Sequence, residues 1–413
     1  MTMFSGAALA WALAGAAPAA EFPPPLRFEE AVAIALSARD PAAERFEAKA
    51  EALEDRAVAE AQLPDPTARV GLANFPVDTF AFDQEPMTQI QAGFRQEFPK
   101  GGTLALNGER RRAEAEGERE RKALTLRRIE LETRLAWLDR YYWTKAQDYI
   151  RQSREAVDEL IDSLSAAFAS GLMTSQDVLR AELELALLDD RLAELRRQEA
   201  TAQAVLARYV GEATARPMPA AMPQLAEPPS LEIMETALAG HPAIRLKNAE
   251  VLAQDIDTEI AEEAYKPSWA LEGGYGLRGG GRADFASVGV SVSIPLFTNK
   301  RQDKKLSAEI KERGAAELAR SAELLDLRRD LGRAYADWTG LQARIDLYDR
   351  AVTVRAGETA EASITAYGGG NADFPELIRS QLAELDAELN RLKLRVDQAK
   401  AWAEIDYLTG GAP

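Results

Sequence analysis

The side chains that most often perform chemistry are scarce in this chain. Its 413 residues include one histidine, His241, and no cysteine. A chain without thiols has no disulfide, no thiolate nucleophile and no cysteine-based zinc or iron–sulfur site. One histidine cannot form a metal cluster with others, and in "GHPAI" we expect it to be a turn or packing residue. We therefore predict no cofactor and no metal site.

Carboxylates are the other candidates for chemistry. The chain carries 67 acidic and 50 basic residues, a net charge of -17. A hydrolase with paired carboxylates is conceivable, but single acids on solvated helix faces are usually structural, and no Gly-rich phosphate loop or nucleophile elbow is present. The negative charge also opposes binding to phosphate backbones. We predict a protein that is not an enzyme and has no nucleic-acid partner.

The N-terminus begins "MTMFSGAALAWALAGAAPAA". Its apolar stretch is too short to span a bilayer, and the small residues that follow fit a signal-peptidase site, so residues 1–20 are expected to be a secretory signal peptide. The absence of Lys or Arg before the apolar stretch departs from the usual pattern. Elsewhere no run approaches the roughly 20 apolar residues of a membrane helix. If this protein spans a membrane, it must do so with strands.

The chain contains an internal duplication. Aligning "AFASGLMTSQDVLRAELEL" with "AYGGGNADFPELIRSQLAE" places Gly171 on Gly370 and Arg180 on Arg379. Other landmarks, such as "RDPA" and "GHPA", recur at nearly the same offset, so the repeat has a period of about 200 residues. The predicted parts are a first repeat, a Pro-rich linker and a second repeat, at residues 21–212, 213–230 and 231–413.

Each repeat contains two segments in which apolar and polar residues alternate. They are "TARVGLAN" with "TQIQAGFRQEF", and "SWALEGGYGLR" with "FASVGVSVSIPL". An alternation with a period of two predicts strands with one apolar face. A tilted strand of about 8 to 11 residues also has the length that crosses a bilayer. Taken alone, these strands are better explained by an ordinary half-buried antiparallel sheet.

The helical segments favour the membrane interpretation. Residues 104–168 can form one helix about 100 Å long, at 1.5 Å per residue. Apolar residues at steps of three and four along this segment, and along residues 178–209, predict two antiparallel coiled-coil helices. Gly171 and Gly370 then lie at the hairpin tips, because glycine accepts the left-handed conformation that ends a helix. The predicted fold class is mostly α, with four strands that enter a membrane.

Four strands cannot close a barrel. An open sheet edge in lipid leaves backbone N–H and C=O groups without partners, at a cost of several kcal/mol each. If the strands are transmembrane, several copies of the chain must therefore join their sheets into one ring. The helices would then continue that ring as a sheath around the pore.

The chain resembles the outer membrane efflux proteins typified by TolC. The resemblance is carried by the duplication, by "ARDPA" and "GHPAI" at the start of each copy, by "SIPLF", and by "GLMTSQDVLRAELEL" with "GGNADFPELIRSQLAEL" at the hairpins. It implies a homotrimer with a twelve-stranded barrel in the outer membrane of a Gram-negative bacterium. It also implies a helical tunnel in the periplasm, joined to a periplasmic adaptor and to an inner membrane pump of the RND type.

The resemblance further assigns roles to residues near the hairpin tips. The tips would contact the adaptor, and the tunnel constriction would carry acidic residues just after each tip. Asp177 is equally well explained as a first-turn acid favoured by the helix dipole, and salt bridges are as plausible there as an acidic ring. The implied adaptor-docking residues are Gly171, Leu172, Met173 and Gly370. The implied gate residues are Asp177, Arg180, Glu376 and Arg379.

The kind of cargo is the least defined part of the prediction. The expected outer loop, "NFPVDTFAFDQEP", is similar to sequences in the heavy-metal branch of the family, whereas the scarcity of His, Cys and Met argues against specific metal ligation. The alternative function is a soluble periplasmic coiled-coil scaffold or adaptor-like protein. A scaffold explains the helices and the acidity but leaves the four strands of bilayer length without a role.

Overall fold

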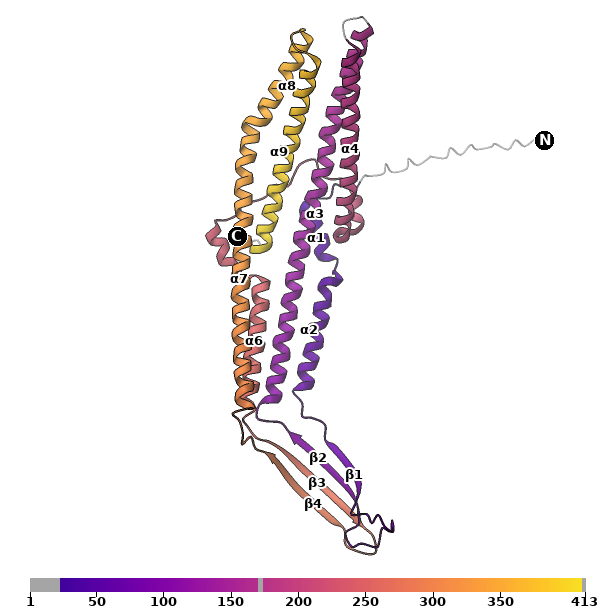
Figure 1. Cartoon of the computed structure of the whole chain (residues 1–413), viewed down its shortest axis with the longest axis vertical. Helices are drawn as coiled ribbons and strands as arrows, with labels where there is room; N and C mark the ends of the chain where they lie inside the picture. The colour runs from indigo at the N-terminus through magenta and orange to yellow at the C-terminus, as the bar shows by residue number, and fades with distance from the viewer. Residues whose placement is uncertain (1–22, 170–173, 411–413) are drawn as a thin grey trace, which may run out of the picture.

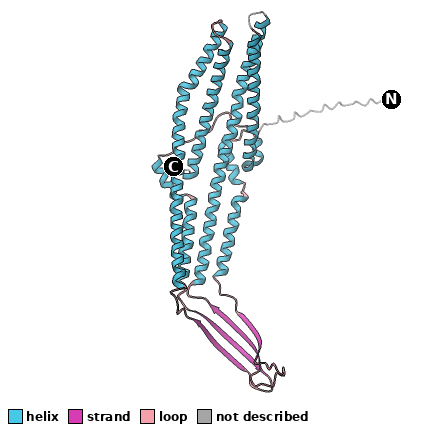
Figure 2. Ribbon diagram, viewed as in Figure 1, coloured by secondary structure: helices cyan, strands magenta, loops and turns pink. Residues whose placement is uncertain are grey.

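The computed structural model describes residues 23–169 and 174–410 as an elongated molecule with helices along most of its length and one sheet at an end (Figures 1 and 2). Two short 3₁₀ helices, Gly211–Ala215 and Leu238–Gly240, flank the connection between the halves. The other elements, in chain order, are α1 (Phe28–Ser37), α2 (Pro41–Glu60), β1 (Thr67–Ala73), β2 (Gln89–Phe98), α3 (Thr103–Ala169), α4 (Ser175–Val210), α5 (Leu231–Ala237), α6 (Pro242–Glu263), β3 (Ser268–Arg278), β4 (Phe285–Ser293), α7 (Gln302–Leu347), a π-helical segment (Tyr348–Val352), α8 (Thr353–Gly368) and α9 (Phe374–Thr409).

Helix α3 is the longest of the described helices. It has 67 residues and extends without interruption from the sheet to the far hairpin, as the sequence predicted. Near the sheet it packs between α2 and α6 through small residues (Figure 1). A Cβ on Gly117 would lie 3.7 Å from Ala249 of α6, and one on Gly108 would lie 3.0 Å from the carbonyl oxygen of Ala57 of α2. Glycine at these positions lets the helix backbones approach closely.

Helix α2 contributes a regular seam to this packing. Its buried residues are Ala43, Ala50 and Ala57, spaced by seven positions. A heptad spacing keeps the same side of a helix against its neighbour over several turns. The side-by-side helices are therefore held by a coiled-coil pattern built from alanine rather than from large apolar residues.

The middle of the molecule has its largest aromatic core. Trp137 of α3 is fully buried among residues of α1, α4 and α9, and its indole Nε1 donates a hydrogen bond to the carbonyl oxygen of Leu26 at 2.9 Å. The Pro-rich connection is fixed here as well, since Trp402 Nε1 donates to the carbonyl oxygen of Ala226 at 2.9 Å. The connection thus packs against the helices. Its composition predicts an extended surface segment with fewer contacts.

The sheet contains four antiparallel strands in the order β1-β2-β3-β4. The central pair, β2 and β3, comes from different halves of the chain and is joined by ten partnered positions, from Gln89 opposite Arg278 to Phe98 opposite Trp269. Strands β1 and β4 form the two outer edges. All four strands were predicted from the alternation of apolar and polar residues.

The second helical hairpin ends at a left-handed glycine. Gly370 has φ 72°, and the N–H of Asn371 donates to the carbonyl oxygen of Ala366 at 2.8 Å. The predicted turn at Gly370 is therefore confirmed, whereas Gly171 lies outside the described residues. One difference from the sequence prediction is that the helix leading to this tip is divided by the π-helical segment, where Thr353 Oγ1 donates to the carbonyl oxygen of Tyr348.

Candidate functional site

One face of the sheet is apolar and exposed. The strand register places Val70, Tyr275 and Ala286 in one cross-strand row, and Gln96, Leu271 and Val290 in another. Side chains on this face have few neighbours: Val70 is 76 % exposed and Val288 is 83 % exposed. A continuous apolar face of this kind is costly in water and is suited to contact with lipid or with another apolar surface.

Aromatic side chains lie at one end of the apolar face. Phe98 and Trp269 occupy opposed positions on β2 and β3, next to the helices, and their rings stack with centroids 3.8 Å apart. Aromatic residues are enriched at the two water interfaces of strands that cross an outer membrane. The position of this pair fits the boundary between the membrane layer and the helical part.

The other face of the sheet is polar, with small side chains. Glycine and serine predominate on it, and its charges are concentrated near the helices. Arg95 Nη1 lies 3.2 Å from Glu272 Oε1, and Ser291 Oγ donates a hydrogen bond to the same carboxylate at 2.8 Å. A polar face with little side-chain volume is what the wall of an aqueous pore requires.

The individual residues of this polar face were not predicted from the sequence. The alternation was recognised, but Arg69, Arg95 and Glu272 were not identified as members of one surface. The available signal was the presence of charged residues at polar positions of otherwise apolar strands. Their mutual placement depends on the register between strands from different halves of the chain, which a single sequence does not display.

The outer edges of the sheet are open. Strand β1 pairs only with β2, and β4 only with β3, among the described residues. Each edge therefore presents backbone N–H and C=O groups that have no partner in the same chain. In lipid such groups must be paired, since each unpaired group costs several kcal/mol.

The opposite end of the molecule carries the four predicted gate residues. Asp177 and Glu376 occupy the first turns of α4 and α9. Thr174 Oγ1 donates a hydrogen bond to the Asp177 carboxylate at 2.7 Å, and Arg379 forms an ion pair with Glu376. Arg180 is exposed. An acidic residue in the first turn of a helix is also favoured by the helix dipole. The positions of both acids are therefore explained without a gate, and their role in a gate stays a prediction.

The two hairpins contact one another near these residues. Phe374 and Ile378 of α9 share an apolar cluster with Ala181 of α4. The pKa of the nearby Tyr367 is raised, mainly by burial and additionally by the Asp177 carboxylate. Gly370 lies at the tip of the second hairpin, between α8 and α9, while the predicted docking residues Gly171, Leu172 and Met173 lie outside the described residues.

His241 is a structural residue, as predicted. It is 1 % exposed, and its Nδ1 accepts a hydrogen bond from the N–H of Ala243 at 3.2 Å, which caps the start of α6. Burial and the neighbouring Arg127 lower its pKa to about 4. A neutral, buried imidazole that caps a helix is not placed to exchange protons with a substrate.

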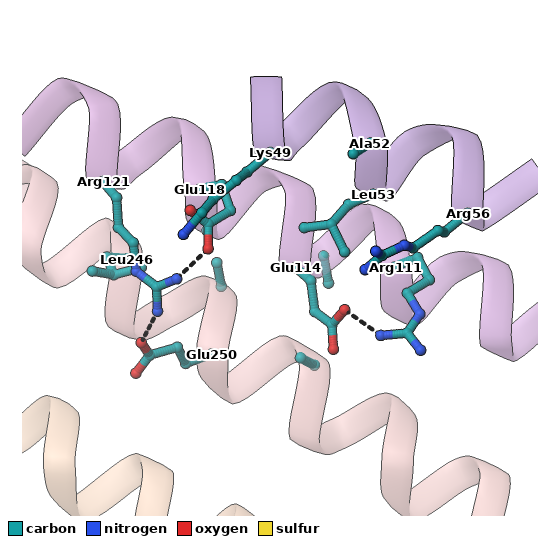
Figure 3. Close-up of a pocket in the computed structure, with 14 residues that line it drawn as sticks. Lys49, Ala52, Leu53, Arg56, Arg111, Glu114, Glu118, Arg121, Leu246 and Glu250 are labelled. Carbon is teal, nitrogen blue, oxygen red and sulfur yellow. Dashed lines mark hydrogen bonds and ion pairs between the residues drawn. The ribbon is translucent and has the colours of Figure 1, made fainter. Parts of the chain in front are cut away.

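A cavity of about 570 Å³ lies between α2, α3 and α6 (Figure 3). Arginines of α3 border it: Arg111 Nη1 lies 2.8 Å from Glu114, and Arg121 Nη2 lies 3.3 Å from Glu250 of α6. The first ion pair lies within α3, and the second connects α3 to α6. No group of three or more His, Cys, Asp or Glu in the described part of the chain is arranged to hold a metal ion.

Within residues 23–169 and 174–410, none of the helices is both long enough and apolar enough to cross a bilayer.

An exposed apolar sheet face, two open sheet edges and a helix of 67 residues are the main features of this fold. Solved structures of membrane proteins have the same fold. A membrane protein from Pseudomonas aeruginosa has a TM-score of 0.80 at 15 % identity, over 93 % of this chain and 90 % of that chain.

Two further solved structures are similar. The outer-membrane channel OprN has a TM-score of 0.77 at 19 % identity, over 93 % of this chain and 90 % of that chain. The outer membrane protein VceC from Vibrio cholerae has a TM-score of 0.76 at 15 % identity, over 93 % of this chain and 96 % of that chain. The predicted TolC-like fold is therefore confirmed.

A family model also matches part of the sequence. Residues 233–411 match the model of the family described as "Outer membrane efflux protein". The matched residues contain the strand pair and the helical hairpin of the second half of the chain. No curated protein has a significant sequence match to this chain.

Proposed function

We propose that this protein is the exit duct of a tripartite efflux system, and that three copies close their sheets into a twelve-stranded barrel in the outer membrane. The observation that carries the proposal is the sheet: one face is apolar and exposed, the other is small and polar, and both edges are open. Closing the ring with other copies pairs every edge and turns the apolar face to lipid. Three copies of four strands form a barrel of ordinary outer membrane size.

The helices extend this barrel into the periplasm as a tunnel. Helix α3 alone, at 1.5 Å per residue, spans about 100 Å. This length supports a route that carries cargo from an inner membrane pump of the RND type, through a periplasmic adaptor, to the exterior. The two repeats, residues 21–212 and 231–413, would each supply two strands and one helical hairpin. Residues 1–20 would direct the chain out of the cytoplasm and be removed.

The hairpin end is the proposed docking and gating region. Gly370, with Gly171, Leu172 and Met173 of the first tip, would contact the adaptor. Repeated around a threefold axis, Asp177 and Glu376 would place like charges in a narrow passage, where they attract cations. The ion pair between Glu376 and Arg379 supports the alternative that part of this charge is neutralised in the resting state.

The heavy-metal branch is a finer proposal about cargo. It depends on the outer-loop sequence, residues 74–86, and no described residue cluster supports it directly. Comparing the susceptibility of a deletion strain to metal salts and to organic antibiotics would test it. Sensitivity to metal salts alone supports the metal branch, and sensitivity to organic compounds alone contradicts it.

Cell fractionation tests the proposed function. The duct proposal predicts that the mature protein occurs in outer membrane extracts as an oligomer that resists SDS until it is heated. Deletion of residues 169–175 and 368–373, which removes both tips, should abolish efflux while leaving membrane insertion normal. A water-soluble monomer in the periplasm would overturn the proposal and favour the scaffold.

A further inference from the structure

One row of the polar sheet face combines a charged residue with unusually small neighbours. The register places Arg69 of β1 opposite Gly93 of β2, Gly93 opposite Gly274 of β3, and Gly274 opposite Ser287 of β4. Residues in one cross-strand row point to the same face of a sheet. The guanidinium of Arg69 therefore lies beside a strip of wall that has almost no side-chain volume.

The strip is hollowed. A cavity of about 310 Å³ is bordered by Arg69, Gln91 and Ser287, with glycines of three strands as its floor. A Cβ added to Gly71 would meet nothing within 4 Å, and one on Gly93 would meet only a backbone oxygen at 3.6 Å. The space above Gly71 and Gly93 is thus open, whereas the side chains of Ser287 and Gln89 lie over Gly274 and Gly276.

The charge of Arg69 is not neutralised within the chain. The neighbouring arginine on this face, Arg95, is paired with Glu97 and Glu272, each at 3.2 Å. Arg69 has no ion pair or hydrogen bond among the described residues. Near the outer end of the strand, Arg278 donates to the carbonyl oxygen of Pro86. Arg69 is therefore the strand arginine with free hydrogen-bond donors beside open space.

We propose that Arg69 and the glycine-floored hollow beside it form an anion-binding subsite on the wall of the channel, for small organic compounds that carry a carboxylate, sulfonate or phosphate group. The guanidinium presents a planar fork of donors that matches such groups. The amide of Gln91 supplies further donors at the rim of the hollow. The hydroxyl of Ser287 donates to the carbonyl oxygen of Gly274 at 3.5 Å and leaves its oxygen at the rim. The inference rests on the proposed function, because it requires the polar face to line a pore.

The subsite has a consequence for the cargo. Three copies of Arg69 in one ring raise the local concentration of anions and lower that of cations, because like charges repel within the pore. A duct with this ring favours organic anions over metal cations. The subsite therefore predicts that anions are enriched at this position of the pore, whereas the heavy-metal assignment requires that cations pass it readily.

The absence of cysteine in the chain allows a direct test. Gly71→Cys introduces one thiol at the edge of the hollow, where its side chain has room. The purified trimer would be treated with two methanethiosulfonates of similar size, one carrying a sulfonate and one a quaternary ammonium. In each case the thiolate attacks the reagent sulfur, a mixed disulfide forms and methanesulfinate leaves. The measured quantity is the ratio of the two rates.

The proposal predicts that the ratio of the sulfonate rate to the ammonium rate is higher for the introduced thiol than for a free thiol in solution. Arg69→Gln should lower this ratio by about tenfold. A unit charge about 6 Å away in water changes each rate about threefold, in opposite directions for the two reagents. Arg39→Gln is the matched control, because it removes an exposed arginine between α1 and α2, outside the sheet. It should leave the ratio unchanged.

The outcomes separate the two proposals. If the introduced thiol reacts in the trimer but Arg69→Gln and Arg39→Gln give the same ratio, the subsite is overturned while the duct stands. If the protein forms no trimer, or if the thiol is accessible only from the lipid side to apolar reagents, the duct itself fails. A second variant, Gly93→Val, fills the hollow without changing charge. It should slow both reagents and leave their ratio high.

Discussion

The guanidinium of Arg95 lies 3.2 Å from the carboxylate of Glu272 and connects β2 to β3 on the polar face of the sheet. These strands come from different halves of the chain, so this ion pair joins the two halves within the proposed barrel. Ser291 of β4 donates to the same carboxylate and extends the network to a third strand. The charges near the helical end of the pore wall are therefore held by the wall itself.

Reversing one member of this pair should weaken the sheet. Glu272→Arg places two arginines side by side, and we expect the temperature at which the SDS-resistant oligomer dissociates to fall by a few degrees. Both side chains are partly exposed, so the pair contributes about 0.5 kcal/mol per chain. The exchange Arg95→Glu with Glu272→Arg restores opposite charges and should recover most of the loss. A double variant no better than the single one would show that the ion pair does not stabilise the sheet.

The two faces of β4 should respond oppositely to the same substitution. Val290→Lys places a charge on the apolar face, where lysine near the middle of the bilayer costs about 2–4 kcal/mol, so insertion should be greatly reduced. Gly289→Lys, one residue away on the polar face, has open space around the glycine and should insert normally. Urea-washed outer membranes would be analysed for both variants. Equal insertion would contradict the orientation of the sheet.

Asp177 distinguishes a gate acid from a simple helix-terminal acid. Asp177→Asn keeps an oxygen that can accept the hydrogen bond from Thr174 but removes the charge. If the residue contributes to a charged constriction, the zero-current potential in a salt gradient should shift toward lower cation selectivity. Asp190→Asn removes the same charge at an exposed position further along α4 and is the control. If the wild type, Asp177→Asn and Asp190→Asn give the same zero-current potential, Asp177 acts only at the start of the helix and not in a gate.

His241 should make the folded protein sensitive to mild acid. Its pKa in the folded state is about 4, whereas an unfolded histidine titrates near 6.5. Below pH 6.5 the unfolded chain therefore binds a proton that the folded chain does not. Stability is lost as the pH falls from about 6.5 to 4, by up to about 3 kcal/mol per chain.

The test compares thermal unfolding of the wild type and His241→Asn between pH 7.5 and 4.5. Asparagine can still cap α6 but does not titrate in this range. The variant should lose less stability on acidification than the wild type. Parallel pH profiles for the two proteins would show that acid destabilises the fold through other groups.

The sequence predicted the long helices and the strands because both depend on local patterns. A stretch without proline and with apolar steps of three and four produced α3, and alternation produced β1 to β4. The left-handed turn at Gly370 was predictable for the same reason. Helices α1 and α5 were not identified, since their stability comes from packing against distant parts of the chain, such as Trp137 on Phe28.

The polar face of the sheet could be predicted only in outline. Alternation shows that Arg69 and Arg95 belong to the polar set of their strands, but not that Arg95 has a partner in Glu272 while Arg69 faces glycine. The first relationship arises from the register between β2 and β3, which are separated in the chain by α3, α4, α5 and α6, and the second from the register between β1 and β2. The free donors of Arg69 became visible only when the four strands were placed together.

A channel of this kind requires that the open edges of the sheet be closed by other copies of the same chain. Within one chain β1 and β4 are separated by two strands, about 14 Å, which is too far for a disulfide. The most direct measurement therefore combines Ala68→Cys on β1 with a cysteine at Val288, Val290 or Val292 on β4 in the cysteine-free protein, followed by oxidation in outer membranes. A control pair, Val70→Cys with Ala92→Cys, lies at opposed positions within one chain and should leave the mass of one chain unchanged.

If three copies close the ring, at least one of the three edge pairs yields covalent dimers and trimers, and no larger species, on denaturing gels. A covalent product that ends at three chains would establish the closed ring. If all three pairs leave only single chains under conditions in which the control pair becomes oxidised, the edges do not meet, and the channel account is wrong.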